Sequence, residues 1–349
     1  MKAAVLAASI AILGGFLIMA LGLELAGYPA GAALASLWRG AFGSWYALTS
    51  ATLVRAVPLI ILGLGFALAL RGGALNIGAE GQFLAGAVAA TWIGVMVAGW
   101  PRLPAISLVL LGSSLAGILW VAVPVILRVR FGVLEVITTL LLNFVAEQLV
   151  SWVVAGPLQE ASRQYPQSDQ IAQAAWLPQL PGARLHLGLG IAILMAWLLW
   201  IILDRTIWGL RLRAVGLAPK AASLSGKINT NGVIGMALLF SGLIAGLGGG
   251  VEITGVTRAL FQNLSPGYGF TAIAVALLAR LHPLAIVATG ILFGALEAGA
   301  VAMQREAGVP AVAVQVVQAW VVIIMAVATV KGRRITAATS AAREADALG

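Results

Sequence analysis

Residues 71–82 carry the polar groups most able to do chemistry in this chain, and they interrupt two long apolar runs. Among glycines that leave the backbone uncovered stand Asn76, Glu80 and Gln82. Unpaired polar groups are very costly in hydrocarbon, so this backbone must face protein or a water-filled path. The pattern predicts a broken or re-entrant segment whose side chains contribute to a substrate path. The Glu80 carboxylate could equally serve as a structural tie that accepts backbone amide hydrogens.

A second polar group lies on the apolar run 133–154. Glu135, Thr139 and Asn143 recur every four residues, which places them on one helix face. That face must be turned toward protein or a pathway rather than lipid. Glu135 is close in sequence to Arg128, which favours an ion pair over substrate contact, whereas Asn143 could bridge helices or line a path.

Two amides near the end of the chain, Gln315 and Gln318, leave similar alternatives open, since they could bind hydroxyl groups or bridge helices.

Gly242, Gly246 and Gly250 form overlapping G-x-x-x-G steps in an apolar run. No Lys-Ser or Lys-Thr pair follows them, so they predict close helix packing and not a phosphate loop.

The composition places the chain in a membrane. Its 349 residues are 61% hydrophobic and 9% charged, and the mean hydropathy is +1.02. Soluble domains carry about 25% charged residues. The absence of cysteine excludes disulfides and thiol chemistry, and two distant histidines argue against a histidine metal site. No P-loop motif and no catalytic constellation occurs, which indicates a transport subunit without a cofactor of its own and not an enzyme.

The expected fold class is an all-α polytopic membrane protein, a single domain over residues 1–349, with ten apolar runs that each approach the about 20 residues a spanning helix needs. The expected spans are 3–22, 51–70, 83–99, 105–127, 133–154, 187–204, 232–250, 268–281, 284–303 and 310–330. The first is expected to be an uncleaved span, and the short eighth to begin inside the membrane. The aromatic segment 30–48 is expected to be an interfacial helix.

Basic residues set the expected orientation. With the N-terminus in the cytoplasm, the inner segments hold 14 lysines and arginines and the outer segments hold 6. Both termini, including the tail 331–349, are therefore expected to be cytoplasmic. The proline-bearing loop 156–186 would then be external, and the loop 205–231 would be cytoplasmic.

The loop 205–231 is longer than a connector requires and carries five basic residues. Pro219 suits a first helical turn and Gly226 suits a helix C-terminal cap, so the loop predicts a short helix that docks to a partner. A solvated basic loop is the alternative. The candidate docking residues are Gly216, Leu217, Pro219, Ala221, Ala222, Ser225 and Gly226.

Five segments together resemble the permeases of ABC importers for simple sugars, within the branched-chain amino acid and sugar permease superfamily. These segments are Pro58–Gln82, Gly132–Asn143, Gly156–Leu158, Arg213–Gly226 and Gly267–Leu278. Their order and spacing hold over residues 43–330. The sequence Asn-Ile-Gly-Ala-Glu-Gly-Gln at 76–82 and the outer Gly-Pro-Leu look most like the nucleoside branch of that family.

The resemblance implies a multi-pass protein of the prokaryotic inner membrane that pairs with a second permease, expected to be a different chain. Two cytoplasmic ATPase subunits would carry ATP and Mg²⁺, and a basic-membrane-protein-type lipoprotein would deliver substrate from outside. Segment 216–226 would couple to the ATPase. The sequence departs from the family pattern at Ala218 and Lys220, where polar or acidic residues are common, which leaves the docking partner's identity open.

The function expected from these observations is ATP-driven import of a nucleoside or similar small polar solute. Ribose or another monosaccharide is an alternative substrate. An ion-coupled secondary transporter is an alternative mechanism, with Glu80, Glu135 or Glu147 as the ion site.

Overall fold

The computed structural model describes residues 2–224, 226, 228–310, 312–316 and 319, with side chains from Leu13 onward. The regular structure of these residues is helical, apart from two isolated β-bridges. The α-helices are α1 Lys2–Leu25, α2 Ala30–Phe42, α3 Leu53–Arg71, α4 Ala79–Met96, α5 Arg102–Phe131, α6 Glu135–Ala155, α7 Gly188–Arg205, α8 Ile207–Leu217, α9 Pro219–Leu224, α10 Thr230–Glu252, α11 Tyr268–Leu278 and α12 Pro283–Ala307. Two π-helical turns, Ala47–Thr52 and Ile253–Thr257, precede α3 and follow α10.

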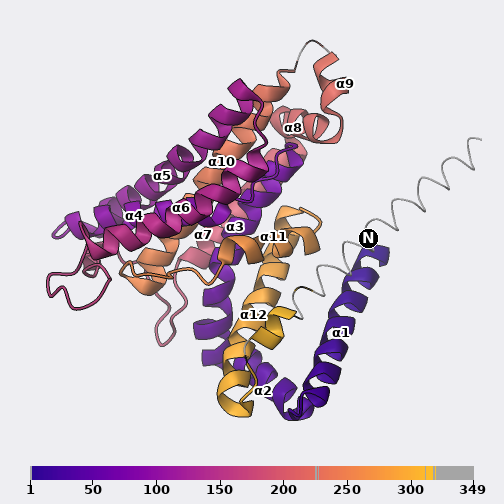
Figure 1. Cartoon of the computed structure of the whole chain (residues 1–349), viewed down its shortest axis with the longest axis vertical. Helices are drawn as coiled ribbons and strands as arrows, with labels where there is room; N and C mark the ends of the chain where they lie inside the picture. Colours follow the sequence, from indigo (N-terminus) through magenta and orange to yellow (C-terminus); the bar gives the residue numbers. More distant parts are fainter. Residues whose placement is uncertain (1, 225, 227, 311, 317–318, 320–349) are drawn as a thin grey trace, which may run out of the picture. The chain divides into compact units, whose positions relative to one another are not determined.

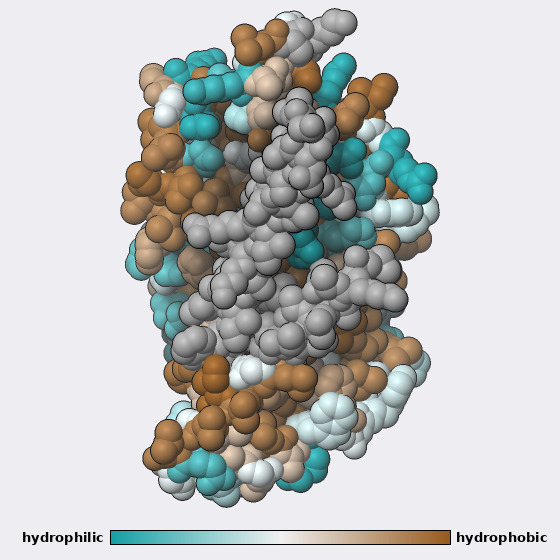
Figure 2. All heavy atoms as spheres, turned by 90° about the vertical axis from the view of Figure 1, so that its right-hand side faces the viewer, coloured by the Kyte–Doolittle hydropathy of each residue, from teal (hydrophilic) through white to brown (hydrophobic). Residues whose placement is uncertain are grey.

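Within the described part of the chain, six helical stretches are long and apolar enough to cross a membrane. They are Ala47–Arg71, Arg102–Phe131, Glu135–Ala155, Gly188–Arg205, Thr230–Thr257 and Pro283–Ala307. Large apolar side chains such as Leu111 on α5 and Phe144 on α6 are exposed. Figure 2 shows hydrophobic surface, in brown, over large areas of the face in view. The all-helical membrane class is therefore confirmed.

Nine of the ten expected spans coincide with helices, and the expected breaks between them occur near the expected residues. The tenth range, 310–330, lies mostly outside the described residues, so the count of ten remains a prediction. The helix at 102–131 is longer than its expected span because Arg128 and Arg130 continue it to a left-handed cap at Gly132. Segment 30–48 forms a helix that ends at Phe42.

The chain divides into two compact units. One contains residues 1–43 and the chain from Leu296 onward, where Arg39 pairs with Glu306 at 2.9 Å. The other contains residues 44–295 and holds the polar residues of the broken segment. In this larger unit, α3 is buried from Ala56 to Ala69 among its neighbours, and α4, α5 and α10 lie side by side (Figure 1).

Glycines allow these helices to approach closely. A Cβ on Gly246 of α10 would collide with the Ser113 carbonyl of α5, and one on Gly249 would collide with the Phe83 carbonyl of α4. Gly117 of α5 meets Gly242 of α10 in the same way. The expected role of the glycine steps in helix packing is confirmed.

Candidate functional site

The apolar helices α3 and α4 are separated by a non-helical segment, residues 72–78. Helix α3 ends where Gly72 and Gly73 follow Arg71, and Gly73 has φ +83°, a left-handed conformation that glycine adopts without strain. The chain then has no regular secondary structure until α4 begins at Ala79. The predicted break is confirmed, and it lies inside the protein because Ala74, Asn76 and Gly78 are buried.

The Asn76 side chain forms the centre of the break. It is fully buried, and its Nδ2 donates to Gln82 Oε1 at 3.0 Å and to Ser241 Oγ at 2.9 Å. Its Oδ1 accepts from the Gly78 amide and from Gln82 Nε2, both at 3.0 Å. Ser241 lies halfway along α10, so this cluster sits at mid-depth of the helix bundle. The side-chain amides thus replace the helical hydrogen bonds that the break removes.

Helix α6 supports the same segment from the other side. Asn143 Nδ2 donates to the Ile77 carbonyl at 2.9 Å, and Asn143 Oδ1 accepts from the Gly81 amide at 2.8 Å. Thr139 bonds to its own helix and packs so closely that a Cβ at Gly78 would lie 2.8 Å from the Thr139 Cβ. The shared face predicted for α6 is buried against the break.

Glu135, at the start of α6, forms the predicted ion pair with Arg128 at 3.3 Å. Its Oε1 also accepts from the Leu75 amide at 3.3 Å, so it holds the break as well. Further along α6, Glu147 is exposed and makes no hydrogen bond or ion pair with the described residues. A free carboxylate on a spanning helix has to meet water or another protein.

Glu80 joins the start of α4 to the start of α11. Its Oε2 accepts from the Gly269 amide at 2.6 Å, and Gly269 is buried against the α4 backbone. Ser265 Oγ accepts from the Gly267 and Tyr268 amides at 3.1 and 3.0 Å and caps α11. One carboxylate therefore lies at two helix N-termini, where the helix dipoles favour negative charge.

The two short helices run in opposite directions from this meeting point. The far end of α4 lies against the loop 156–186, named the outer loop for its expected position, since the Ala172 amide donates to the Gly94 carbonyl at 2.9 Å. The far end of α11 leads into α12, which packs antiparallel on α3: Ile286 approaches Gly63, and Gly290 approaches Ile60. That places the end of α11 on the Arg71 side. Two broken segments thus enter from opposite ends, as expected of inverted repeats.

The second broken segment, residues 258–267, is attached to the outer loop. Main-chain bonds of 2.9 and 2.8 Å join Ile171 to Arg258 and Ser168 to Leu260. The Arg258 guanidinium carbon lies 3.7 Å from the ring centroid of Trp176. The loop 156–186, which is predicted to be external, therefore supports the chain that leads into α11.

His186 closes this loop onto α7. It is 4% exposed, its Nδ1 accepts from the Gly188 amide at 3.1 Å, and its ring packs on Gly255. Burial lowers the pKa of His186 to about 4, because the charged imidazolium is poorly solvated there.

The predicted docking helix is present as α9, which begins at Pro219, and Gly226 after it has φ +67°. Some of the candidate docking residues are buried and others are exposed. Ala222 is buried in an apolar cluster with Ala74 and Val215, and Gly216 packs on the α3 end. The remaining described candidates, Leu217, Pro219, Ala221 and Gly226, are exposed, whereas Ser225 lies outside the described residues.

The two remaining candidates are the glutamines near the end of the chain. Gln315 is exposed on a helical turn of the other unit, and Gln318 lies outside the described residues. The structure adds Ser241, Ser265 and Gly269, which sequence reasoning missed as partners. Ser265 could have been found from the sequence, because a serine shortly before an apolar helical run is a helix-start signal.

A family model described as the branched-chain amino acid transport system / permease component matches residues 48–328. A glucose ABC transporter permease protein of Haloferax volcanii, TsgB13, is 38% identical over 81% of this chain and 76% of its own. The guanosine ABC transporter permease protein NupP of Bacillus subtilis is 35% identical over 91% of each chain. The nucleoside ABC transporter permease protein NupB of Lactococcus lactis is 33% identical over 93% of this chain and 91% of its own.

Bacillus subtilis has a second guanosine ABC transporter permease protein, NupQ, which is 29% identical over 71% of this chain and 79% of its own. No solved structure matches the chain. The match over residues 48–328 includes both broken segments, the meeting point of α4 and α11, and helix α9. The chain is a member of the branched-chain amino acid transport system permease family.

Proposed function

We propose that this chain is the permease subunit of an ATP-driven importer that moves a nucleoside into the cytoplasm. The observation that carries the proposal is the similarity to NupP and NupB, which extends over more than nine-tenths of this chain. The exposed helix α9 supports it, since a short helix beyond the apolar spans gives partner ATPases a place to bind. ATP and Mg²⁺ would be held by those partners.

The proposed complex contains a second, different permease, two ATPase subunits and a solute-binding lipoprotein. The two different guanosine permease proteins of Bacillus subtilis support the paired arrangement. The excess of basic residues near α8 and α9 supports a cytoplasmic position for this end, with both termini inside and the outer loop facing the lipoprotein. In a bacterium this would be the inner membrane.

We further propose that the solute passes beside the meeting point of α4 and α11. The buried residues Asn76, Glu80, Gln82, Thr139 and Asn143 would shape this part of the path by holding the broken backbone. Glu147 is the side chain we assign to direct contact, because it is exposed on the same helix as Asn143, and a carboxylate accepts hydrogen bonds from ribose hydroxyls. Gln315 and Gln318, which the sequence also marks as candidates to bind hydroxyl groups, stay predictions.

Reconstitution tests the proposal. The permease pair, its ATPases and the lipoprotein are placed in proteoliposomes, and uptake of labelled guanosine, ribose and glucose is compared with and without ATP. ATP-dependent accumulation of guanosine supports the proposal. Accumulation of free sugars only would favour the second candidate, which the similarity to TsgB13 supports. Accumulation driven by an ion gradient without ATPases would overturn the ATP-driven mechanism.

The docking role is tested at two adjacent positions of α9. Ala221→Asp changes an exposed side chain, so it should weaken ATPase binding while the permease remains folded. Ala222→Asp places a carboxylate in the apolar cluster of Ala74 and Val215, so it should also lower the yield of folded protein. If the ATPase copurifies with Ala221→Asp as strongly as with the unchanged chain, α9 is not the docking helix.

A further inference from the structure

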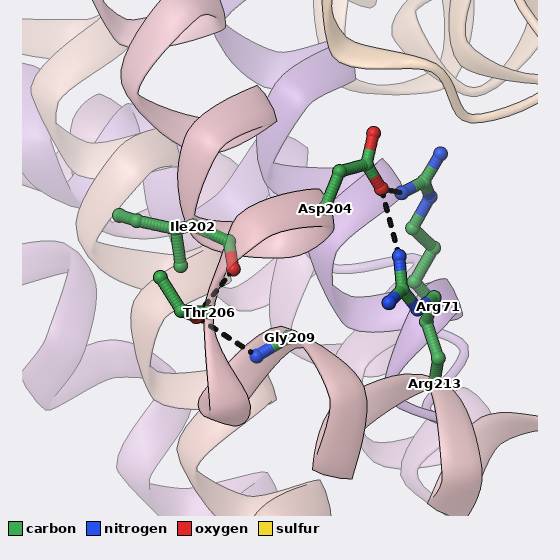
Figure 3. Close-up of polar contacts among 6 residues, drawn as sticks. All are labelled: Arg71, Ile202, Asp204, Thr206, Gly209 and Arg213. Atoms are coloured by element: carbon green, nitrogen blue, oxygen red, sulfur yellow. Dashed lines mark hydrogen bonds and ion pairs between the residues drawn. The ribbon is translucent and has the colours of Figure 1, made fainter.

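Asp204 lies where three elements meet: the end of α3, the last turn of α7 and the middle of α8 (Figure 3). Its Oδ1 accepts from Arg213 Nη1 at 2.9 Å and from Arg71 Nη1 at 3.3 Å. Arg71 is the last residue before the first broken segment, and Arg213 is on the helix that leads into α9. A single carboxylate thus links the docking region to the start of the break.

The corner between α7 and α8 is closely packed. Thr206 accepts from the Gly209 amide at 3.2 Å and donates to the Ile202 carbonyl at 2.6 Å (Figure 3). A Cβ on Gly209 would collide with the Ile202 and Leu203 carbonyls. Because the corner has little room to bend, α8 and the end of α7 should move together.

Backbone touches backbone beside the Asp204 pairs. Gly216 at the end of α8 packs on the Arg71 carbonyl, so closely that a Cβ there would overlap it, and Gly73 lies against Gly216. No side chain separates the backbone at Gly216 from the backbone of residues 71–73. A displacement of α8 toward α3 would therefore push on residues 71–73, whereas a sliding movement of α8 would be transmitted only through the Asp204 pairs.

An apolar cluster joins α9 to the same segment. Ala222 of α9 is buried with Ala69 of α3, Ala74 of the broken segment and Val215 of α8. Ala74 is two residues from Asn76, the centre of the buried amide cluster. The path from the docking helix to the meeting point of α4 and α11 is therefore continuous.

We infer that Asp204 is a positioning residue that transmits movement of the docking helix to the broken segment 72–78. This inference rests on the proposed function, because it assumes ATPases that pull on α9. When they move α8 and α9, the Asp204 pairs and the Gly216–Gly73 contact carry residues 72–78 along, and Asn76 and Gly78 then shift the start of α4. Without the pairs, α8 slides past α3, and ATP hydrolysis no longer changes the site.

The test uses the complete complex in proteoliposomes, with ATP hydrolysis and ATP-dependent uptake measured on the same sample. Asp204→Asn and Arg213→Gln should leave hydrolysis within about twofold, whereas uptake per ATP hydrolysed should fall by about tenfold or more. Arg211→Gln is the matched control, because Arg211 is an exposed arginine of the same helix without an ion pair among the described residues. It should change neither quantity.

A second readout does not require uptake. This chain has no cysteine, so Leu75→Cys gives it a single thiol, and labelling measured on this chain after the subunits are separated reports on the broken segment. In complexes that retain ATP hydrolysis, the thiol labelling rate should differ between the nucleotide-free and ATP-bound states, and Asp204→Asn should remove that difference. If Asp204→Asn lowers the yield of complex, Arg213→Gln is compared, since it preserves the Arg71–Asp204 pair.

Unchanged uptake per ATP in both variants, or an unchanged labelling difference, would overturn the positioning role. Failure of the proposed function gives a different result: the unchanged complex would show no ATP-dependent uptake and no labelling difference, whatever residue stands at position 204.

Discussion

The two broken segments end at the same point but are held by different parts of the chain. Residues 72–78 are held by side chains of spanning helices: Glu135 and Asn143 of α6 and Ser241 of α10. Residues 258–267 are held by main-chain bonds from the outer loop, and within them Gln262, Asn263 and Pro266 are exposed. Ser168, Ile171 and Leu260 are buried as well, so the difference is that the first support comes from spanning helices and the second from a loop.

This difference indicates separate control of the two half-helices. The segment before α4 is connected through Arg71 and Gly73 to α8 and α9, the predicted docking end, and the segment before α11 is connected through Ile171 and Ser168 to the loop 156–186. They meet at the Glu80–Gly269 bond. Each of the two segments thus leads to the meeting point from a support of its own.

The largest effect is expected from Asn76→Leu, which tests the buried support. The leucine would leave the Gly78 amide, the Gln82 side chain and Ser241 Oγ without the bonds that Asn76 supplies. Each unsatisfied buried group costs about 1–3 kcal/mol, so unfolding free energy should fall by more than about 3 kcal/mol. Thermal unfolding of the detergent-purified protein measures this loss.

Ser265→Ala is the matched control in the second segment. Ser265 caps α11 but is only partly buried, so water can replace part of its role, and the expected loss is about 1 kcal/mol. Equal destabilisation by the two substitutions would contradict the difference between the segments.

Gly269→Ala tests the point where the half-helices meet, with a smaller expected effect. The new Cβ would lie 2.8 and 2.9 Å from Cα and Cβ of Glu80 and would push α4 and α11 apart. Overpacking of this kind costs about 1–3 kcal/mol, and uptake should fall with it. Gly190→Ala on α7 is the control, because its nearest neighbour, Leu187 Cδ1, would be 3.6 Å away. If both variants transport normally, close contact at the meeting point is not required.

Sequence reasoning located the first support because polarity is conspicuous in an apolar chain. Asn76, Glu80 and the Glu135–Asn143 face stood out on type and spacing alone. Their partners did not, because Ser241 is 165 residues from Asn76 and the Gly269 amide is 189 residues from Glu80. A backbone amide has no sequence signature, and a serine in a helix is common.

At α9, the predicted docking helix, the sequence likewise predicted the element but not its contacts. Pro219 and Gly226 predicted a helix correctly, but six residues of α9 are too few to reveal which face is buried. The burial of Ala222 follows from Ala74 and Val215, which lie in other elements. The three-way contact of Asp204 likewise depends on the corner between α7 and α8.

A pH-dependent effect is expected at the outer support. Burial lowers the pKa of His186 to about 4, whereas in the unfolded chain it is near 6.5. Between these values the unfolded chain binds a proton that the folded loop does not. The free energy of unfolding is therefore unaffected by His186 above about pH 6.5 and decreases as the pH falls toward 4. At pH 5.5 the decrease is about 1.4 kcal/mol.

Hydrogen exchange at residues 184–189 measures this loss. In the unchanged protein, exchange at these residues, corrected for the intrinsic rate, should be faster at pH 5.5 than at pH 7.5. His186→Gln removes the titrating group and should remove that acceleration. Persistence of the same pH dependence in the variant would assign it to another group.

The smallest effect is expected from Ser168→Ala, which removes one bond between the outer loop and the second broken segment. Ser168 Oγ accepts from the Leu260 amide at 2.9 Å, while the main-chain bond from the Ser168 amide to the Leu260 carbonyl at 2.8 Å remains. Because one of two bonds survives, the expected loss is about 1 kcal/mol and is local. Hydrogen exchange should accelerate in residues 258–264, and the peptide covering residues 72–78 should be unchanged. Acceleration in both peptides would mean that the two segments are one cooperative unit, and that the outer loop and the docking end act on the same element.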